Sequence, residues 1–463
     1  MATETKKQLH VVVLPWLAFG HMIPFLELSK SIAQRGHKVT FVSTPRNIQR
    51  LPKFPSELAS SDLNFLEFHI PRTESLPENA EATADVPLNK VHFLKKAFDD
   101  VQIQVAQFLE TSRPDWLIYD FACHLLPSAA AKLGISLAFF SSFNGWSAAF
   151  FGSPSSAHQR TKPEDYTAPP KWIPFPSRLA FRRHELGRMA EVAQENASGV
   201  SDWERFSKTV TGCDAVLIRS CRELESEWLG LVQELLEKPV IPVGLLPQTA
   251  QDGETELDKN WQIISDWLDN QARGSVIYVA LGTEVSLSED EVNELATGLE
   301  LSGLPFFWTL RPNPFQSLEL PSGFEERVKG RGLVWRSWAP QLKILSHGSI
   351  GGFLTHCGWS SIIEGLQHGK PLVMLPFQAD QGLNARILED KMVGVEVSRS
   401  EDGSLRSNWV GESIRLIMTG EKGQIYRDKA AQMKNVFGDK DLQEKHKNGL
   451  VEYLEKNQTS PAP

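Results

Sequence analysis

The sequence predicts an α/β protein with two domains, each built on a doubly wound parallel sheet. The 463 residues are roughly two to three times the length of a typical domain. In both halves, short apolar runs alternate with amphipathic helical segments, which is the pattern of parallel strands joined by helices. A polar stretch at 247–256 (PQTAQDGETE) separates the halves. We therefore expect the domain boundary near 245–258.

Composition excludes several classes of protein. Hydrophobic residues make up 41% and charged residues 23% of the chain, an ordinary globular mixture. The net charge of -9 lacks the basic excess typical of nucleic-acid binding. The first apolar run begins at Val11 and is too short for a signal peptide, and no later run is long enough to cross a bilayer. The four cysteines show no metal-binding spacing, so we expect a reduced, cytoplasmic protein without disulfides.

The first half opens with a strand, a helix and a second strand. The continuous apolar run His10–Leu14 predicts a strand buried on both faces, and Pro15–His21 a loop. Apolar residues three and four apart then predict a helix that ends at Gly36, before the β-branched strand Lys38–Ser43. The same alternation predicts a strand at Trp116–Tyr119, a helix at Leu125–Leu133 and a strand at Ser136–Phe140.

The second half repeats this order. Ser275–Leu281 predicts a strand, and Ser288 with Glu291 forms a capping box that opens a helix running to Leu301. Further on, the pattern predicts strands at Phe306–Leu310, Gly351–Thr355 and Leu372–Leu375, and a helix from about Trp359.

Two long proline-containing segments, Pro71–Asn89 and Ser153–Pro176, interrupt the first half. Each is equally well interpreted as a surface connection or as a loop that shapes a substrate mouth, because long loops in compact domains are often functional.

The segment 338–381 contains the densest group of candidate functional residues. His356 follows a predicted strand, and Gly358, Ser360 and Ser361 lie where the next helix begins. Free N–H groups at a helix start, together with hydroxyls, form a site for an anion such as a diphosphate.

Other residues of this segment suit a nucleotide sugar. Glu364 can accept hydrogen bonds from the vicinal hydroxyls of a ribose, and Trp338 offers a face on which a base can stack. Asp380 and Gln381 form a carboxylate–amide pair suited to sugar hydroxyls. Each residue taken singly is better explained by a structural role, but their combination in this order is not.

The segment from Trp338 to Gln381 resembles the C-terminal signature box of plant family-1 UDP-sugar glycosyltransferases, and the rest of the chain is similar to that family from end to end. The resemblance implies a GT-B fold, in which two Rossmann-like domains face each other across a cleft. It implies an acceptor domain at 1–245, a UDP-sugar domain at 246–440, and a C-terminal helix and tail at 441–463 that pack back on the acceptor domain.

The resemblance also implies a role for each residue of the donor motif. The family commonly has Asn where this chain has Ser360, so contact with the sugar or phosphate is expected to differ there. Trp338 would stack on uracil with Gln341 near the nucleoside, Glu364 would hold the ribose, His356, Ser361 and Thr283 the diphosphate, and Trp359, Ser360, Asp380 and Gln381 the sugar.

A candidate catalytic pair lies in the first half. His21 follows the first strand, and imidazole titrates near neutrality, as a general base requires. Asp120 follows the strand Trp116–Tyr119, and parallel strands end at the same edge of a sheet, so Asp120 can orient His21. A capping or core role for His21 is the alternative on position alone. The resemblance assigns these same catalytic roles to both residues.

No cofactor and no metal are expected, and the UDP-sugar is a co-substrate. The D-x-D pattern at Asp439–Asp441 lies in a polar tail and is interpreted as solvated surface. A nucleotide-dependent dehydrogenase is disfavoured because neither first strand is followed by GxGxxG. A non-catalytic sugar-binding protein would not need the pair of His21 and Asp120.

Four segments resemble the plant subgroup that extends sugars on flavonoid or terpenoid glycosides: Pro15–His21, Ser43–Ile48, Ala280–Glu284 and Gly358–Ser361. The expected function is therefore inverting transfer of glucose from UDP-glucose to a hydroxyl of such a glycoside by a monomeric enzyme. Transfer from UDP-rhamnose, or glucosylation of an aglycone hydroxyl, remain alternatives. Candidate acceptor-binding residues are Trp16, Phe19, Phe143, Asn144, Trp146 and Phe377.

Overall fold

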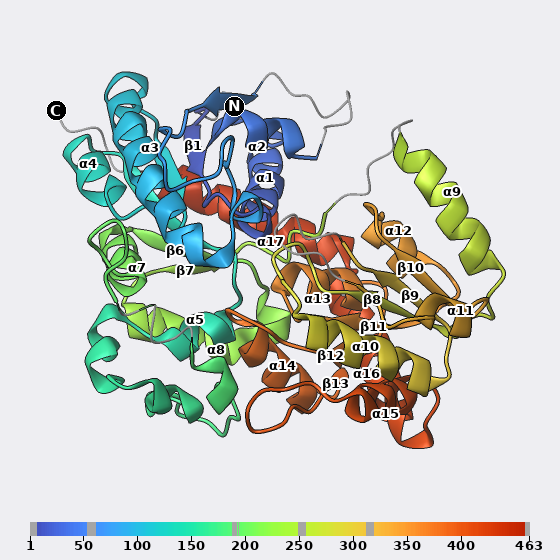
Figure 1. Ribbon diagram of the computed structural model, residues 1–463. Helices are drawn as coiled ribbons and strands as arrows, with labels where there is room; N and C mark the ends of the chain where they lie inside the picture. The colour runs from blue at the N-terminus through green and yellow to red at the C-terminus, as the bar shows by residue number, and fades with distance from the viewer. Residues whose placement is uncertain are drawn as a thin grey trace, which may run out of the picture. The chain divides into compact units, whose positions relative to one another are not determined.

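The computed structural model describes residues 7–52, 62–187, 192, 194–248, 256–311 and 319–458, and the chain divides into two compact units (Figure 1). Unit 1 comprises Met1–Thr161, Met189–Gln251 and Lys440–Pro463, and unit 2 comprises Lys162–Arg188 and Asp252–Asp439. The segment Lys162–Arg188, which the sequence analysis places in the first domain, thus groups with unit 2. Residues 249–255 of the expected boundary lie outside the described residues.

Unit 1 is built on a seven-stranded sheet in which every pair of neighbouring strands is parallel. Strand β1 (His10–Leu14) lies inside the sheet, between β2 (Lys38–Ser43) and β4 (Trp116–Tyr119). These strands are apolar and buried, as a sheet covered on both faces requires. The outer strands are β3 (Leu63–Glu67), β5 (Ser136–Ser141), β6 (Ala215–Ile218) and β7 (Val240–Pro242), in the order β3-β2-β1-β4-β5-β6-β7.

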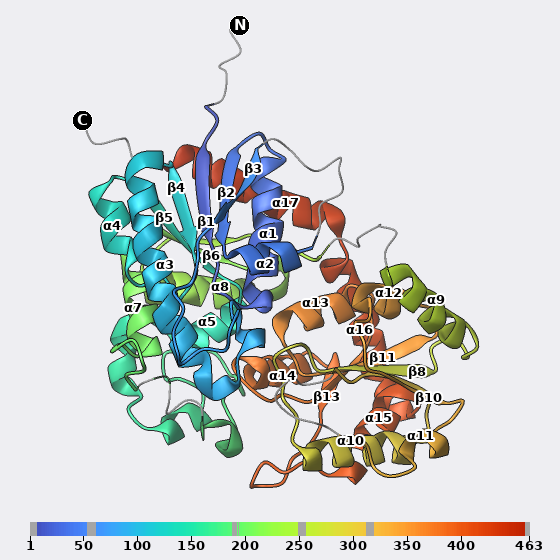
Figure 2. The ribbon, with the colours of Figure 1, turned by 45° about the horizontal axis from the view of Figure 1, so that its top comes forward.

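Helices cover both faces of this sheet (Figure 2). Helices α3, α4 and α7 lie on one face, whereas α1 and α17 lie on the other and contact each other. The α-helices of unit 1 are α1 (Phe19–Ala33), α2 (Pro45–Arg50), α3 (Val91–Ser112), α4 (Leu126–Lys132), α5 (Gly145–Phe151), α7 (Asp202–Gly212), α8 (Arg222–Leu236) and α17 (Lys440–Lys456). Short 3-10 helices lie in or at the end of the two proline-containing segments, at Thr83–Asp85, Leu88–Lys90 and Pro154–Gln159 in unit 1 and at Pro163–Thr167 in the part that groups with unit 2.

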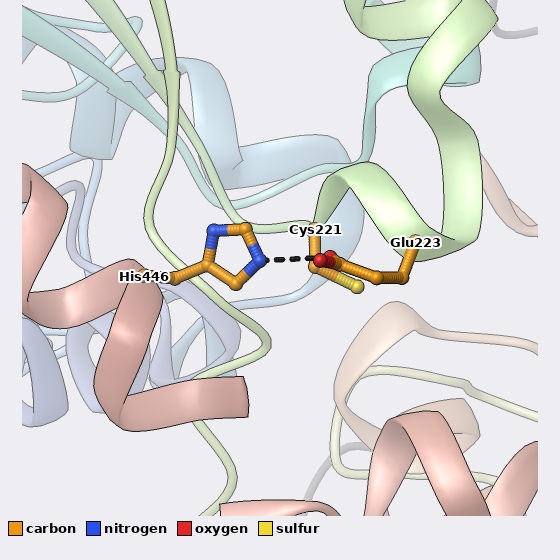
Figure 3. Close-up of side chains that lie close together, drawn as sticks. All are labelled: Cys221, Glu223 and His446. Carbon is orange, nitrogen blue, oxygen red and sulfur yellow. Dashed lines mark hydrogen bonds and ion pairs between the residues drawn. The ribbon is translucent and has the colours of Figure 1, made fainter. Parts of the chain in front are cut away.

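The last helix, α17, is anchored in unit 1 by apolar and polar contacts. Leu450 and Leu454 are fully buried in the core of the unit, and the indole of Trp116 donates to the carbonyl of Leu454 at 3.0 Å. His446 points from α17 toward Glu223 at the start of α8, with Nε2 2.9 Å from the carboxylate and Cys221 beside them (Figure 3). The apolar residues Leu450 and Leu454 thus form the face of α17 that packs in the core of unit 1.

Unit 2 is built on a six-stranded parallel sheet with the order β10-β9-β8-β11-β12-β13. Strands β8 and β11 lie at its centre, and β11 is followed directly by the loop His356–Gly358 of the expected donor motif. The strands are β8 (Val276–Ala280), β9 (Phe306–Thr309), β10 (Gly332–Trp335), β11 (Ile350–Thr355), β12 (Leu372–Met374) and β13 (Gly394–Glu396).

In unit 2, helices α10, α11 and α15 cover one face of the sheet, and α12, α13 and α16 cover the other (Figure 2). The capping box of Ser288 and Glu291 opens α10 as expected. The α-helices are α9 (Glu256–Asp269), α10 (Glu289–Ser302), α11 (Phe324–Arg327), α12 (Gln341–Ser346), α13 (Trp359–Leu366), α14 (Gln381–Asp390), α15 (Ser407–Met418) and α16 (Gln424–Phe437), with 3-10 helices at Arg183–Glu185 and Glu421–Gly423.

The segment 162–187 packs against α14 through ion pairs. Arg386 of α14 contacts the buried carboxylate of Glu185 at 2.8 Å, and Arg178 reaches Glu389 and Asp390. Gly382 lies under the Glu185–Arg386 pair, where an added Cβ would collide with both side chains. This part of the first half of the sequence therefore contacts the helix that begins at Gln381. Among the described residues, no helix is long and apolar enough to cross a membrane.

Candidate active site

His21 lies in the first turn of α1, the helix that follows strand β1. The helix begins at Phe19 rather than after the expected loop Pro15–His21, because the N–H of His21 already bonds to the carbonyl of Ala18 at 2.9 Å. The imidazole is therefore carried by regular helix, a more rigid support than a loop.

Asp120 fixes the orientation of His21. Because β4 is parallel to β1 and pairs with it, the residue after β4 lies at the same edge of the sheet as the start of α1. Nδ1 of His21 is 2.8 Å from Oδ2 of Asp120, which also accepts from the N–H of Trp16 at 2.9 Å. Oδ1 accepts from the N–H of Phe121 at 2.7 Å. With both oxygens occupied and 1% exposure, the carboxylate has one well-defined position.

This pair can perform general base catalysis. A hydrogen on Nδ1, held by the carboxylate, leaves Nε2 as the nitrogen that accepts a proton. When Nε2 takes up that proton, the charge of Asp120 stabilises the imidazolium. The rings of Phe121 and Phe143 flank the imidazole, with centroids 5.7 and 5.6 Å away. The hydroxyl of Ser142, which sequence reasoning missed, lies 3.1 Å from Nδ1.

The segment behind Asp120 is held by buried polar side chains. Arg205 is fully buried, pairs with both oxygens of Asp99 and contacts the carbonyl of Ala122 at 3.4 Å. Thr209 donates to the carbonyl of Phe121 at 3.0 Å. Interlocked contacts of this kind preorganise a catalytic side chain.

The six candidate acceptor residues divide into two groups. Phe19, Phe143 and Phe377 are partly exposed and can offer an apolar surface. Trp146 is fully buried, and Asn144 is buried with its side chain capping α5 through the N–H of Ser147, so their side chains serve the structure instead. Trp16 is 4% exposed, its ring is packed on Phe98 and Phe121, and it contributes its backbone N–H to Asp120.

His356, a residue of the expected donor motif, lies between two glycines. A Cβ on Gly282 would lie 2.7 Å from its Nε2, and one on Gly358 2.5 Å, so only glycine permits this close approach on either side. Burial lowers the pKa of His356 to about 4, and within the described residues its Nδ1 has no hydrogen-bond partner. At neutral pH the side chain is therefore a neutral imidazole, able to donate one hydrogen bond to an anion.

This pKa has a consequence for stability. Between pH 6.5 and about 4 the unfolded chain binds a proton at this position and the native chain does not, so the free energy of unfolding decreases as pH falls through that window. We expect His356→Gln to remove this contribution. Thermal unfolding of both proteins from pH 7.5 to pH 4.5 should show the wild type losing more stability than the variant. Parallel curves would contradict the assignment.

Glu364 belongs to a polar network around Gln341, and the side chain of Trp338 is 47% exposed. The amide of Gln341 donates to Glu364 at 2.5 Å and to the hydroxyl of Ser361 at 3.4 Å, and its oxygen accepts from the hydroxyl of Tyr278 at 3.2 Å. The structure thus brings three predicted residues together and adds Tyr278. Tyr278 lies on a buried strand, and nothing in the sequence indicated that its hydroxyl contacts this network.

The other residues with a predicted donor role lie at the start of α13 and in the loop that follows β8. The side chain of Trp359 is 4% exposed and packs edge-on against Phe437, so its indole belongs to the packed interior. A contact of Trp359 with the sugar would therefore come from its main chain. Ser360 is partly exposed and Ser361 buried, both in the first turn of α13. Thr283 is exposed in the loop that follows β8.

Asp380 and Gln381 lie at the start of α14, and both are largely buried. The side-chain oxygen of Gln381 accepts from the N–H groups of Phe377 and Gln378 at 2.9 and 3.0 Å. Its orientation is therefore fixed, and the amide presents N–H donors rather than an acceptor to a ligand. The carboxylate of Asp380 accepts from the amide of Asn384 at 2.9 Å.

Comparison with known proteins gives one family match and two similar relatives at the level of sequence. The "UDP-glucoronosyl and UDP-glucosyl transferase" family matches residues 206–443 of this chain. UDP-glycosyltransferase 91C1 of Arabidopsis thaliana is 50% identical over 98% of each chain. Soyasaponin III rhamnosyltransferase of Glycine max is 42% identical over 97% of this chain and 96% of its own.

Solved structures agree with the fold. The crystal structure of Arabidopsis thaliana UGT89C1 complexed with UDP-L-rhamnose is similar with a TM-score of 0.74 and 25% identity, over 97% of this chain and 99% of that one. Two parallel-sheet, Rossmann-like units in the GT-B arrangement of elements were expected from the sequence, and this expectation is confirmed.

Proposed function

The chain belongs to the UDP-glucoronosyl and UDP-glucosyl transferase family, and from this premise we propose that it transfers glucose from UDP-glucose to a hydroxyl of a plant natural-product glycoside, with His21 as the general base. The observation that carries the proposal is the 2.8 Å contact of His21 with the buried carboxylate of Asp120. A protein that only binds a UDP-sugar has no use for an oriented imidazole.

The proposed reaction is a single displacement. Nε2 of His21 takes the proton of the acceptor hydroxyl, and the oxygen attacks C1 of the sugar as the bond from C1 to the phosphate oxygen breaks. UDP leaves with that electron pair, and the configuration at C1 inverts. The N–H groups at the start of α13 and the neutral imidazole of His356 would stabilise the charge on the leaving diphosphate.

The geometry of Gln381 supports glucose as the transferred sugar. Its amide donors and the carboxylate of Asp380 form a donor–acceptor pair on adjacent residues, which suits two neighbouring equatorial hydroxyls. Rhamnose is the second candidate, because one relative is named a rhamnosyltransferase and another was solved with UDP-L-rhamnose. Ser360, which is shorter than the usual Asn, also leaves room for a different contact.

For the acceptor we propose a hydroxyl on a sugar already attached to a flavonoid or terpenoid. The name of the soybean relative, which specifies a soyasaponin, supports this class, since saponins are glycosides. An aglycone hydroxyl is the alternative. The partly exposed rings of Phe19 and Phe143 would contact the apolar part of either acceptor.

A competition assay tests donor and acceptor together. The protein is incubated with equal amounts of UDP-glucose, UDP-galactose, UDP-xylose and UDP-rhamnose and a panel of glycosides and their aglycones, and products are identified by mass spectrometry. Glucosylated glycosides are expected to dominate. A tenfold excess of rhamnosylated product would overturn the glucose assignment, and products formed only from aglycones would overturn the glycoside assignment.

We also propose that transfer needs no metal, because the start of α13 and His356 take the place of a cation at the diphosphate. Activity is expected to persist in excess EDTA.

Among the described residues, one group of three could offer metal ligands: Cys221, Glu223 and His446, in unit 1, where His446 and Glu223 already pair with each other. If EDTA abolishes activity and Mg²⁺ or Mn²⁺ restores it in both the wild type and Cys221→Ser, the proposal of a metal-free donor site is wrong.

The cellular setting is proposed from the cysteines. All four are buried and free, which suits a reducing compartment such as the cytoplasm. We propose a monomer that has a UDP-sugar and a glycoside as its partners.

A further inference from the structure

Asn384 joins two parts of the donor motif. It lies in the first turn of α14, and its side chain is fully buried. One atom, Nδ2, donates both to the carbonyl of Cys357 at 3.0 Å and to Oδ2 of Asp380 at 2.9 Å. The first bond reaches the loop between His356 and Gly358, and the second reaches the carboxylate proposed to contact the sugar.

The bond to Cys357 supports an unusual backbone conformation. Cys357 has a φ of 68°, in the left-handed region that residues with a Cβ adopt at a cost. Such a conformation persists where neighbouring groups hold it, and here the Cys357 N–H bonds to Thr355 at 3.3 Å while its carbonyl accepts from Asn384. The peptide fixed in this way leads directly into the start of α13.

The bond to Asp380 fixes the direction of a carboxylate. An aspartate side chain has two rotatable bonds, and its oxygens are equivalent until a neighbour distinguishes them. The contact with Asn384 commits Oδ2, so the position of the other oxygen follows from the geometry of the carboxylate. A carboxylate that selects among sugar hydroxyls must be oriented in this way before the ligand arrives.

We propose that Asn384 is a positioning residue for the donor. It fixes the carboxylate of Asp380 relative to the loop His356–Gly358, which is proposed to hold the diphosphate. This inference rests on the proposed function, since it takes Asp380 and His356 as contacts of the sugar and the diphosphate. Asparagine suits the task because its amide nitrogen carries two hydrogens, one for each acceptor. Aspartate at this position has no N–H, and serine can donate only one hydrogen bond.

The consequence is a loss of selectivity between sugars, beyond any loss of stability. With Asn384→Ala or Asn384→Asp, Asp380 loses the hydrogen bond from Nδ2, and in the second variant a like charge lies beside it. Selection between sugars that differ at one hydroxyl should fall, because the carboxylate can rotate to meet either one.

The test compares kcat/KM for UDP-glucose and for its C4 epimer UDP-galactose in the same preparation, so that the ratio does not depend on the fraction of folded protein. We expect the wild-type ratio to fall about tenfold in both Asn384 variants, as for the loss of one buried hydrogen bond. Leu388→Ala is the matched control, because Leu388 is a buried residue of the same helix that makes neither hydrogen bond. It should lower the melting temperature and leave the ratio unchanged.

Two results would count against the inference in different ways. A wild-type ratio in both Asn384 variants, or an equal fall in Leu388→Ala, overturns the role of Asn384 and leaves the proposed function standing. A wild-type protein that transfers sugar from no UDP-sugar overturns the proposed function itself, and the inference with it.

Discussion

His21→Ala should abolish sugar transfer while the protein still binds UDP. General base catalysis contributes roughly 10²–10⁴-fold to a rate, and alanine removes the only group of this side chain that accepts a proton. UDP affinity should stay within about threefold of the wild type, because the residues proposed to hold UDP belong to unit 2 and His21 to unit 1. Initial rates with saturating UDP-sugar, and calorimetric titration with UDP alone, measure the two quantities separately.

His10, a histidine on the strand that precedes α1, provides the control. His10 lies at the amino end of β1, the end opposite His21, where its imidazole contacts Thr40 at 2.9 Å. His10→Ala should therefore lose some stability and keep its turnover. Near wild-type turnover in His21→Ala would refute the assignment of the base.

Asp120→Asn completes this prediction, and the structure shows why it is not a neutral replacement. Both oxygens of Asp120 accept hydrogen bonds from N–H donors, so an amide nitrogen at either position meets a donor instead of an acceptor. The rate should approach that of His21→Ala, and an unmet buried hydrogen bond should also cost about 1–3 kcal/mol of stability. A low rate together with a lower melting temperature is the expected combination.

The strands that could be predicted from the sequence are those buried on both faces. His10–Leu14, Lys38–Ser43 and Trp116–Tyr119 match the observed strands, because a continuous β-branched and apolar run has few other interpretations. The edge strand β3 was missed, since most of its residues are only partly buried and do not form such a run. β7 is three residues long and lies inside Pro239–Leu246, a stretch that is strand-like in sequence and borders the expected linker.

The residues of the candidate site, like the strands, could be predicted from the sequence only in part. His21 and Asp120 could be paired from sequence, because strand ends in a parallel sheet share one edge and both residues follow strands. Asn384 and Tyr278 could not, since their roles depend on contacts between segments that have no fixed spacing along the chain. Aromatic residues near the site were also ambiguous: Phe143 flanks the imidazole, whereas Trp146, three residues later, is fully buried.

The second large expected effect is that of substituting Gln381. In the structure, the oxygen and the nitrogen of its side-chain amide have separate roles. Its oxygen accepts from two backbone N–H groups of the loop that ends at Asp380, and its nitrogen is left to donate to a sugar hydroxyl. Gln381→Ala removes both functions, so it should lower the melting temperature as well as glucosyl transfer. Gln381→Glu keeps an oxygen for the two N–H groups and replaces only the donor.

Gln381→Glu should therefore keep the contacts with the two N–H groups and lose about one to two decades in kcat/KM for UDP-glucose, which corresponds to about 1–3 kcal/mol for one buried hydrogen bond. The repulsion between the new carboxylate and Asp380 acts in the same direction. Glu364→Ala is the comparison, because a contact with ribose is shared by every UDP-sugar and its loss should weaken all of them alike. Should Gln381→Glu keep wild-type efficiency with UDP-glucose, the amide does not donate to the sugar, and the selection of glucose must lie elsewhere in the motif.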